Sequence, residues 1–122
     1  MLSRGHGCIV NMSSVAGLVG GRFGAAYYAS KHGVIGATKA AAIEYADQGI
    51  RINAVCPAII ETPMVERAFD GDEEMRDRFR AIHPVGRFGT PEEVASATLW
   101  LCSEGAAFTI GHALAVDGGR LI

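Results

Sequence analysis

The chain has 122 residues, of which 49% are hydrophobic and 20% are charged, and this composition is typical of a globular protein with a large buried fraction. A chain of this length forms one domain at most. Its formal net charge of −2 and its dispersed basic residues give no electrostatic case for binding nucleic acid or an anionic membrane.

The first half of the chain is predicted to form a strand, a loop and a long helix. Residues 8–12 are a short apolar run flanked by glycine and serine, which indicates a buried strand. Residues 13–24 contain four glycines and predict an extended loop. Residues 25–48 are rich in alanine, lack proline and end at Gly49, a position typical of a left-handed helix cap.

The next segments predict a second strand and two short helices. Residues 50–56 indicate a strand that is stopped by Pro57, and residues 57–62 a loop. Residues 63–83 are predicted to be helical in two pieces, broken around Asp70-Gly71. Acidic residues open the second piece, where negative charge complements the helix dipole.

The last segments complete an alternating pattern of strands and helices. Thr90, Pro91 and Glu93 predict a capped helix start, and this helix runs to about Cys102. Residues 113–116 indicate a third strand, closed by a tight turn at 117–119. This order favours parallel pairing through right-handed crossovers, so we expect an α/β fold with part of a doubly wound, Rossmann-like parallel sheet and flanking helices.

Cysteine usage and the chain start bear on the compartment. Cys8, Cys56 and Cys102 are odd in number and form no Cys-x-x-Cys pair, which favours reduced, buried thiols over a disulfide framework or a zinc site. The four histidines and the acidic run 70–74 lack metal-ligand spacing, so no metal is expected. The first six residues do not resemble a secretory signal, and no run approaches about 18 apolar residues. We therefore expect a cytoplasmic protein without a membrane partner.

Tyr27 and Lys31 are candidate acid–base residues on the predicted long helix. Residues four apart share one helix face on successive turns. An ammonium within reach of a phenol stabilises the phenolate, and the tyrosine can then exchange a proton with a carbonyl or alcohol oxygen. Tyr28 is the rival, but the residue four positions after it is His32. Most pairs at this spacing are a packed ring and a solvated amine, so the pair needs support from its context.

Ser14 supplies that context. It lies 13 residues before Tyr27, directly after the predicted strand 8–12. The carboxyl ends of strands in a parallel sheet form the crevice in which ligands bind. A serine hydroxyl at this edge can therefore donate a hydrogen bond to a substrate oxygen while Tyr27 moves the proton.

Motifs along nearly the whole chain resemble the compact, single-domain short-chain dehydrogenase/reductases. Their order and spacing are those of the family, and together they are very specific. They are Asn11-Met-Ser-Ser14, Tyr27-Tyr-Ala-Ser-Lys31, Arg51-Ile-Asn-Ala-Val-Cys-Pro57, Thr62-Pro-Met64, Gly86-Arg87 with Pro91-Glu-Glu-Val94, and Gly111-His-Ala-Leu-Ala-Val-Asp-Gly-Gly119. The resemblance implies that residues 1–122 are the C-terminal catalytic half of one NAD(P)-binding Rossmann domain and contribute the last three strands of its sheet.

The same resemblance implies an oxidoreductase that transfers hydride between NAD or NADP and a small secondary alcohol or ketone. Ser14 would position the substrate carbonyl, and Tyr27 would be the general acid/base. Lys31 would support the proton transfer, and both Tyr27 and Lys31 would also bind the cofactor, Lys31 through the nicotinamide ribose. The loop after the second strand would lie against the nicotinamide through Pro57, Ile60 and Thr62.

Other positions are also interpreted through the resemblance. Residues 63–90 correspond to the family's substrate lid, and Ser13 is expected to be a structural turn residue. Ala58 stands where the family usually has glycine, which is either a tolerated methyl group or a slight distortion of the cofactor loop. Because the family is commonly tetrameric, a homo-oligomer is an implied partner.

The glycine-rich Thr-Gly-x-x-x-Gly-x-Gly turn of the family is not present in the 122 residues. Without it the choice between NAD and NADP cannot be read, and strand 8–12 is expected to present an open apolar edge. Two functions therefore stand: the enzyme, and a truncated, inactive remnant that only packs or oligomerises, which we favour for these 122 residues alone. A sugar-nucleotide epimerase or dehydratase shares the Tyr-x-x-x-Lys pair but is disfavoured by the short tail after Thr90.

Overall fold

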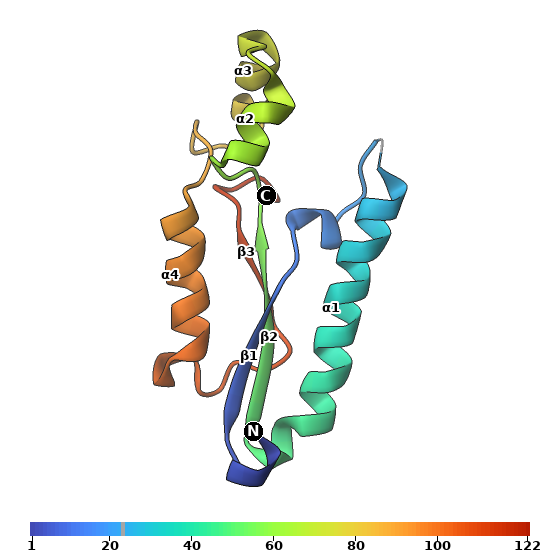
Figure 1. Cartoon of the computed structure of the whole chain (residues 1–122), viewed down its shortest axis with the longest axis vertical. Coiled ribbons are helices and arrows are strands. Elements are labelled where there is room, and N and C mark those ends of the chain that lie inside the picture. The colour runs from blue at the N-terminus through green and yellow to red at the C-terminus, as the bar shows by residue number, and fades with distance from the viewer. Residues whose placement is uncertain (23) are drawn as a thin grey trace.

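The computed structural model describes residues 1–22 and 24–122, which form a three-stranded parallel sheet flanked by helices (Figure 1). The strands are β1 (Gly7–Met12), β2 (Ile50–Pro57) and β3 (Ala113–Val116), in the order β1-β2-β3. β1 pairs with β2 along its whole length, whereas β3 pairs with the carboxyl half of β2. The predicted α/β fold and parallel sheet are confirmed.

The long helix lies on one side of the sheet, and the last helix lies on the other (Figure 1). α1 (Ala25–Tyr45) is followed by a single 3-10 turn over Ala46–Gln48, so the predicted helix is right in extent but its last turn is tighter. Gly49 caps it with a φ of 74°, in the left-handed region that favours glycine. α4 (Pro91–Cys102) begins with the predicted capping box, formed by Thr90 and Glu93.

Two short helices stand at the carboxyl ends of the strands (Figure 1). They are α2 (Pro63–Phe69) and α3 (Glu73–Ala81), and they confirm the predicted helical segment in two pieces. The break is at Asp70, with a φ of 48°, and Gly71, with a φ of 78°. Asp72 caps α3 by accepting a hydrogen bond from the Met75 N–H at 2.9 Å.

The segment between β1 and α1 differs from the predicted extended loop. Residues Val15–Gly17 form a buried 3-10 turn that packs against α1, while Phe23, which that prediction also covered, lies outside the described residues. A side chain at Gly17 would place its Cβ 2.7 Å from the Lys31 carbonyl oxygen, so only glycine permits this close approach. β2 also continues through Pro57, one residue beyond the predicted end of the strand.

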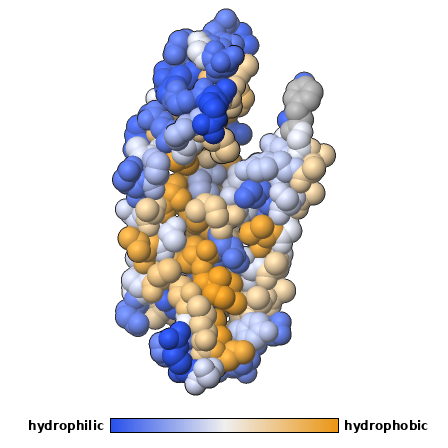
Figure 2. Space-filling model, viewed as in Figure 1, coloured by the Kyte–Doolittle hydropathy of each residue, from blue (hydrophilic) through white to orange (hydrophobic). Residues whose placement is uncertain are grey.

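β2 forms the centre of the core, because it is paired on both sides. Its residues Ala54, Val55 and Cys56 are fully buried. β1 pairs only with β2 within the described part of the chain, and two of its apolar side chains, Ile9 and Met12, are 37% and 53% exposed. Figure 2 shows apolar side chains gathered between α4 and α1, on the face where β1 lies. The expected apolar edge is therefore present in the described residues.

None of the described helices combines the length and the apolar composition that crossing a bilayer requires.

Candidate active site

Two adjacent serines at the carboxyl end of β1 point in different directions. Ser13 is buried, and its hydroxyl donates a hydrogen bond of 3.0 Å to the Lys31 carbonyl oxygen in α1. Ser14 is half-buried and caps the following 3-10 turn, accepting from the Ala16 N–H at 3.1 Å. Its own hydroxyl hydrogen is directed toward the Pro57 carbonyl oxygen, 3.5 Å away, at the end of β2. The alternating geometry of an extended chain thus makes Ser13 a packing residue and presents Ser14 at the edge of the sheet.

The first two turns of α1 carry Tyr27 and Lys31. The ammonium nitrogen of Lys31 lies 5.7 Å from the centre of the Tyr27 ring and donates to the Met12 carbonyl oxygen at 3.3 Å. The ring of Tyr27 is 52% exposed, and Tyr28 meets it edge-on at 6.4 Å between ring centres. The predicted common face of Tyr27 and Lys31 is therefore present, and the lysine is anchored to the last residue of β1.

The loop after β2 pairs with the segment before α4 through a parallel bridge between Ile60 and Gly89. Gly89 donates to the Ile59 carbonyl oxygen at 3.0 Å and accepts from the Glu61 N–H at 2.9 Å. In a parallel bridge of this kind the N–H and C=O of the central residue point the opposite way. The main-chain groups of Ile60 are thus directed away from Gly89, and in the described part of the chain they have no main-chain partner.

These elements meet around one open cavity of about 430 Å³ at the carboxyl end of the sheet. The cavity is lined by residues from β1, α1, the loop after β2 and α2. All six residues singled out from the sequence line it: Ser14, Tyr27, Lys31, Pro57, Ile60 and Thr62. A hydroxyl, a phenol, an ammonium and a stretch of free main chain therefore share one crevice, as expected for the strand ends of a parallel sheet.

Sequence reasoning missed one cation at this cavity, Arg120. It lies four residues after the end of β3, whose carboxyl end points to the same edge as those of the other two strands. That placement was a usable signal, since every polar residue shortly after a strand end in a parallel sheet is a candidate for the crevice.

Thr62 has a structural task beside its place at the cavity. Its hydroxyl caps α2 by accepting from the Val65 N–H at 3.3 Å. The hydroxyl hydrogen is not used in this contact and can be donated to a ligand. Met64 from the same helix is 69% exposed and lines the cavity.

Cys56 lies near the carboxyl end of β2, one residue before Pro57 of the candidate site, and is fully buried. Burial raises the pKa of its thiol above the ordinary value of 9.0, while contacts with Ser13, the Ser14 main chain and Lys31 oppose this rise. The thiol is therefore protonated near neutral pH and is no nucleophile. The predicted burial of Cys56 is confirmed, but the same prediction is wrong for Cys102, which is exposed, and for Cys8, which is half-buried.

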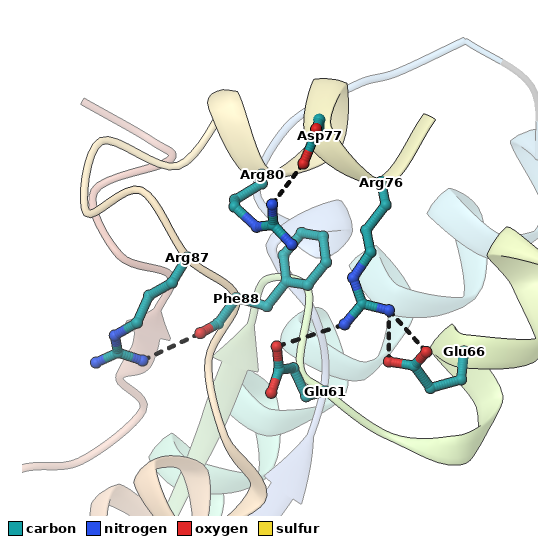
Figure 3. Close-up of polar contacts among 7 residues, drawn as sticks. All are labelled: Glu61, Glu66, Arg76, Asp77, Arg80, Arg87 and Phe88. Carbon is teal, nitrogen blue, oxygen red and sulfur yellow. Dashed lines mark hydrogen bonds and ion pairs between the residues drawn. The ribbon is translucent and has the colours of Figure 1, made fainter. Parts of the chain in front are cut away.

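Arg76 in α3 joins α2 and α3 to the loop after β2 (Figure 3). Its guanidinium pairs with both carboxylate oxygens of Glu66 at 2.7 Å and with Glu61 at 3.6 Å. It also lies over the rings of Phe69 and Phe88, at 6.0 and 5.7 Å from their centres. One nitrogen, Nη1, contacts Glu66 and the other, Nη2, contacts Glu61, while the planar group lies over the two rings, a combination that a guanidinium provides and an ammonium does not. This cluster was not predicted, because its members are spread from Glu61 to Phe88 in the sequence and meet only in the folded structure.

The matching family model agrees with this geometry. A family model described as Enoyl-(Acyl carrier protein) reductase matches residues 1–120. The chain belongs to the short-chain dehydrogenase/reductase family. The resemblance found in the motifs is thereby confirmed.

Two curated relatives of this family are dehydrogenases of cyclic alcohols by name. The chain is 47% identical over 120 residues to a 2,5-dichloro-2,5-cyclohexadiene-1,4-diol dehydrogenase from Sphingobium indicum, covering 98% of the chain and 48% of that protein. It is 48% identical over 118 residues to a cyclohexanol dehydrogenase from an Acinetobacter species, covering 97% and 45%. The chain thus spans about half the length of the curated relatives it matches.

A solved structure shows the same relation in three dimensions. The structure of ElxO with NADP bound superimposes on the chain with a TM-score of 0.91 at 44% identity, covering 99% of this chain and 49% of that one. The shared part is therefore one half of a short-chain dehydrogenase/reductase domain.

Proposed function

We propose that the protein that carries this chain is an NAD(P)-dependent oxidoreductase acting on a secondary alcohol or ketone, with Tyr27 as the general acid/base. One observation supports this most: Ser14, Tyr27 and Lys31 line a single cavity at the carboxyl ends of the strands. An oxidoreductase of this kind must place a proton donor and a hydrogen-bond donor around one carbonyl oxygen, and these side chains supply both.

Each of the three side chains has a distinct proposed role. In the direction of reduction, Tyr27 donates its phenolic proton to the carbonyl oxygen, and Ser14 donates a hydrogen bond that stabilises the negative charge developing there. The ammonium of Lys31, held by the Met12 carbonyl oxygen, stabilises the resulting phenolate. In the direction of oxidation the same phenolate accepts the alcohol proton.

The cavity also fits one end of the cofactor. When it is bound, the nicotinamide supplies or accepts the hydride. The free N–H and C=O of Ile60 match the donor and acceptor of a carboxamide, and Thr62 retains a hydroxyl hydrogen for the same group. The ring of Pro57 offers an apolar surface beside them. Lys31 would hold the ribose of the nucleoside, so Tyr27 and Lys31 serve the cofactor and the substrate together.

The proposed substrate is a small alicyclic alcohol or ketone. The two relatives named above are dehydrogenases of cyclohexane and cyclohexadiene alcohols. In this chain, Met64 and Val65 of α2 add apolar surface to the cavity. Phe69, in contrast, packs inside the lid against Phe79 and Phe88 at 5.7 Å between ring centres, and it is buried away from a substrate.

Replacing Tyr27 by phenylalanine in the full-length protein tests the acid–base assignment. Tyr27→Phe removes one hydroxyl and keeps the ring, so it should lower kcat by at least about 100-fold and leave cofactor affinity nearly unchanged. Tyr28→Phe is the matched control on the next residue of α1 and should keep most of the activity. If Tyr27→Phe retains wild-type turnover, the assignment of Tyr27 fails.

A second proposal concerns the 122 residues taken alone, namely that they form an inactive unit that packs or associates through its apolar face. It is supported by the open edge of β1 and by the sequence, which has no glycine-rich turn to hold a pyrophosphate. Titrating NADH into the 122-residue chain while following cofactor fluorescence separates the two proposals. Saturable binding with a micromolar Kd would end the proposal of an inactive unit.

A further inference from the structure

Two of the three cysteines, 94 residues apart in the chain, meet in the structure. The sulfur of Cys8 in β1 lies 3.7 Å from the sulfur of Cys102, the last residue of α4. A disulfide bond needs the two sulfurs about 2 Å apart, so an approach of less than about 2 Å would close the bond. The pair lies at the amino end of β1, at the opposite end of the sheet from the candidate active site.

Arg51 holds the end of α4 beside Cys8. It is the residue of β2 directly opposite Cys8 in the strand register. Its guanidinium donates to four main-chain carbonyl oxygens at and after the end of α4, at distances of 2.6 to 3.2 Å. These oxygens belong to Leu101, Cys102, Ser103 and Ala106. This one cation satisfies the last two carbonyl oxygens of α4, those of Leu101 and Cys102, so the end of α4 is held against the start of β1.

The two thiols are open to a small oxidant. Cys102 is exposed, Cys8 is half-buried, and both line an open cavity of about 470 Å³ together with Arg51. Cys56 is fully buried near the carboxyl end of β2 and does not line this cavity. A two-thiol set is also too small for a metal, since no cluster of three or more His, Cys, Asp or Glu ligands occurs among the residues described by the structure.

We propose that Cys8 and Cys102 are an oxidation site that hydrogen peroxide converts into a disulfide. The thiolate of Cys102 attacks one peroxide oxygen, the O–O bond breaks, and a sulfenic acid and one water form. The thiolate of Cys8 then attacks that sulfur, the S–O bond breaks, and a second water leaves. In total two thiols lose two protons and two electrons, one S–S bond forms, and one peroxide is reduced to two waters.

The surroundings set the pH at which the reaction is fast. Burial raises the pKa of the Cys8 thiol above the ordinary value of 9.0, the neighbouring Cys102 adds to the rise, and the charge of Arg51 opposes it. The other titratable groups lining this cavity are His6 and Glu104. Because the thiolate is the attacking species, disulfide formation should accelerate as the pH rises from 7 to 9.

Peptide mapping of the full chain tests the proposal directly. Trypsin places the three cysteines in three different peptides, residues 5–22, 52–67 and 88–120. After treatment with hydrogen peroxide and blocking of free thiols, the first and third peptides should appear linked in the monomer and separate again with dithiothreitol. Three results would each overturn the proposal: separate alkylation of Cys8 and Cys102 after peroxide treatment, a disulfide to Cys56, or a disulfide-linked dimer.

A stability measurement gives a second readout that does not depend on enzyme activity. The disulfide ties the edge strand to the last helix across most of the chain, so oxidation should raise Tm by at least about 5 °C. Cys56→Ser keeps the pair and should show the same rise. Cys8→Ser and Cys102→Ser remove one partner each and should show none, and a rise in either variant would contradict the assignment.

Discussion

The buried hydroxyl of Ser13 donates a hydrogen bond of 3.0 Å to the main-chain carbonyl oxygen of Lys31. The contact joins the carboxyl end of β1 to the second turn of α1, the turn that carries the candidate proton-transfer pair. Both serines line the cavity, but the hydroxyl of Ser14, the next residue, is directed along the sheet edge toward the Pro57 carbonyl oxygen and not to α1. The two serines therefore differ in role. The hydroxyl of Ser13 holds the turn that carries Lys31, whereas the hydroxyl of Ser14 lies at the sheet edge, where a substrate can reach it.

This difference predicts unequal effects on activity for two alanine variants of the full-length protein. Ser14→Ala should lower kcat/KM by about 100-fold, because a hydrogen bond to the developing oxyanion is lost, while the loss of its cap to the Ala16 N–H should lower the free energy of unfolding by only about 1 kcal/mol. Ser13→Ala should lower the free energy of unfolding by about 1 kcal/mol and reduce activity only a few-fold. Steady-state kinetics measure the activity of both variants, and unfolding experiments measure their stability. A larger loss of activity in Ser13→Ala than in Ser14→Ala would reverse the roles.

Local signals made most of the fold readable from the sequence. The capping box of Thr90 and Glu93, the glycine after residue 48 and the break at Asp70-Gly71 are short-range features whose geometry is fixed by a few neighbouring residues. The candidate site was readable for a related reason, since strand ends in a parallel sheet must converge on one edge.

Contacts between distant segments could not be read in this way. Arg51 looks like an ordinary strand residue in the sequence, yet it binds the end of α4 about 50 residues later. The sequence predicts Cys8 and Cys102 only as separate buried thiols, because no short-range sequence feature shows that β1 and the end of α4 are neighbours. Such pairings depend on the crossover that places α4 across the face of the sheet.

We predict that Arg76 keeps α2 and α3 closed against the loop after β2. Arg76→Ala removes the ion pairs with Glu61 and Glu66 and the contact with two phenylalanine rings, so α2 and α3 should open more often. Hydrogen exchange of the amides in residues 63–81 should become about three- to tenfold faster, while α4 should keep its wild-type rates. Arg78→Ala is the matched control, since its ion pair with Glu74 is exposed on both sides. Equally faster exchange in both variants would show that Arg76 does not hold α2 and α3 in place.

Glu93 predicts how stability depends on pH. Its carboxylate accepts hydrogen bonds from the Arg87 guanidinium at 2.6 and 2.9 Å and from the Thr90 N–H at 2.9 Å. The contact with Arg87, followed by that with Thr90, lowers the pKa of Glu93 from 4.5 to about 2. Because the folded state holds the charged form more strongly than the unfolded state, Glu93 stabilises the fold above pH 4.5. This contribution is lost as the pH falls through about 2.

Glu93→Gln keeps the size of the side chain and removes its charge, so it isolates this effect. The variant should have a lower Tm than the wild type at pH 7, and the difference should shrink between pH 4.5 and 2. Circular dichroism melts across this range measure the difference, and Glu92→Gln in the same helix turn is the control for a change of net charge. Below pH 2 the wild-type carboxyl is itself neutral, and the two melting curves should coincide. A gap that persists there would mean that the shape of the capping contact, and not its charge, stabilises the start of α4.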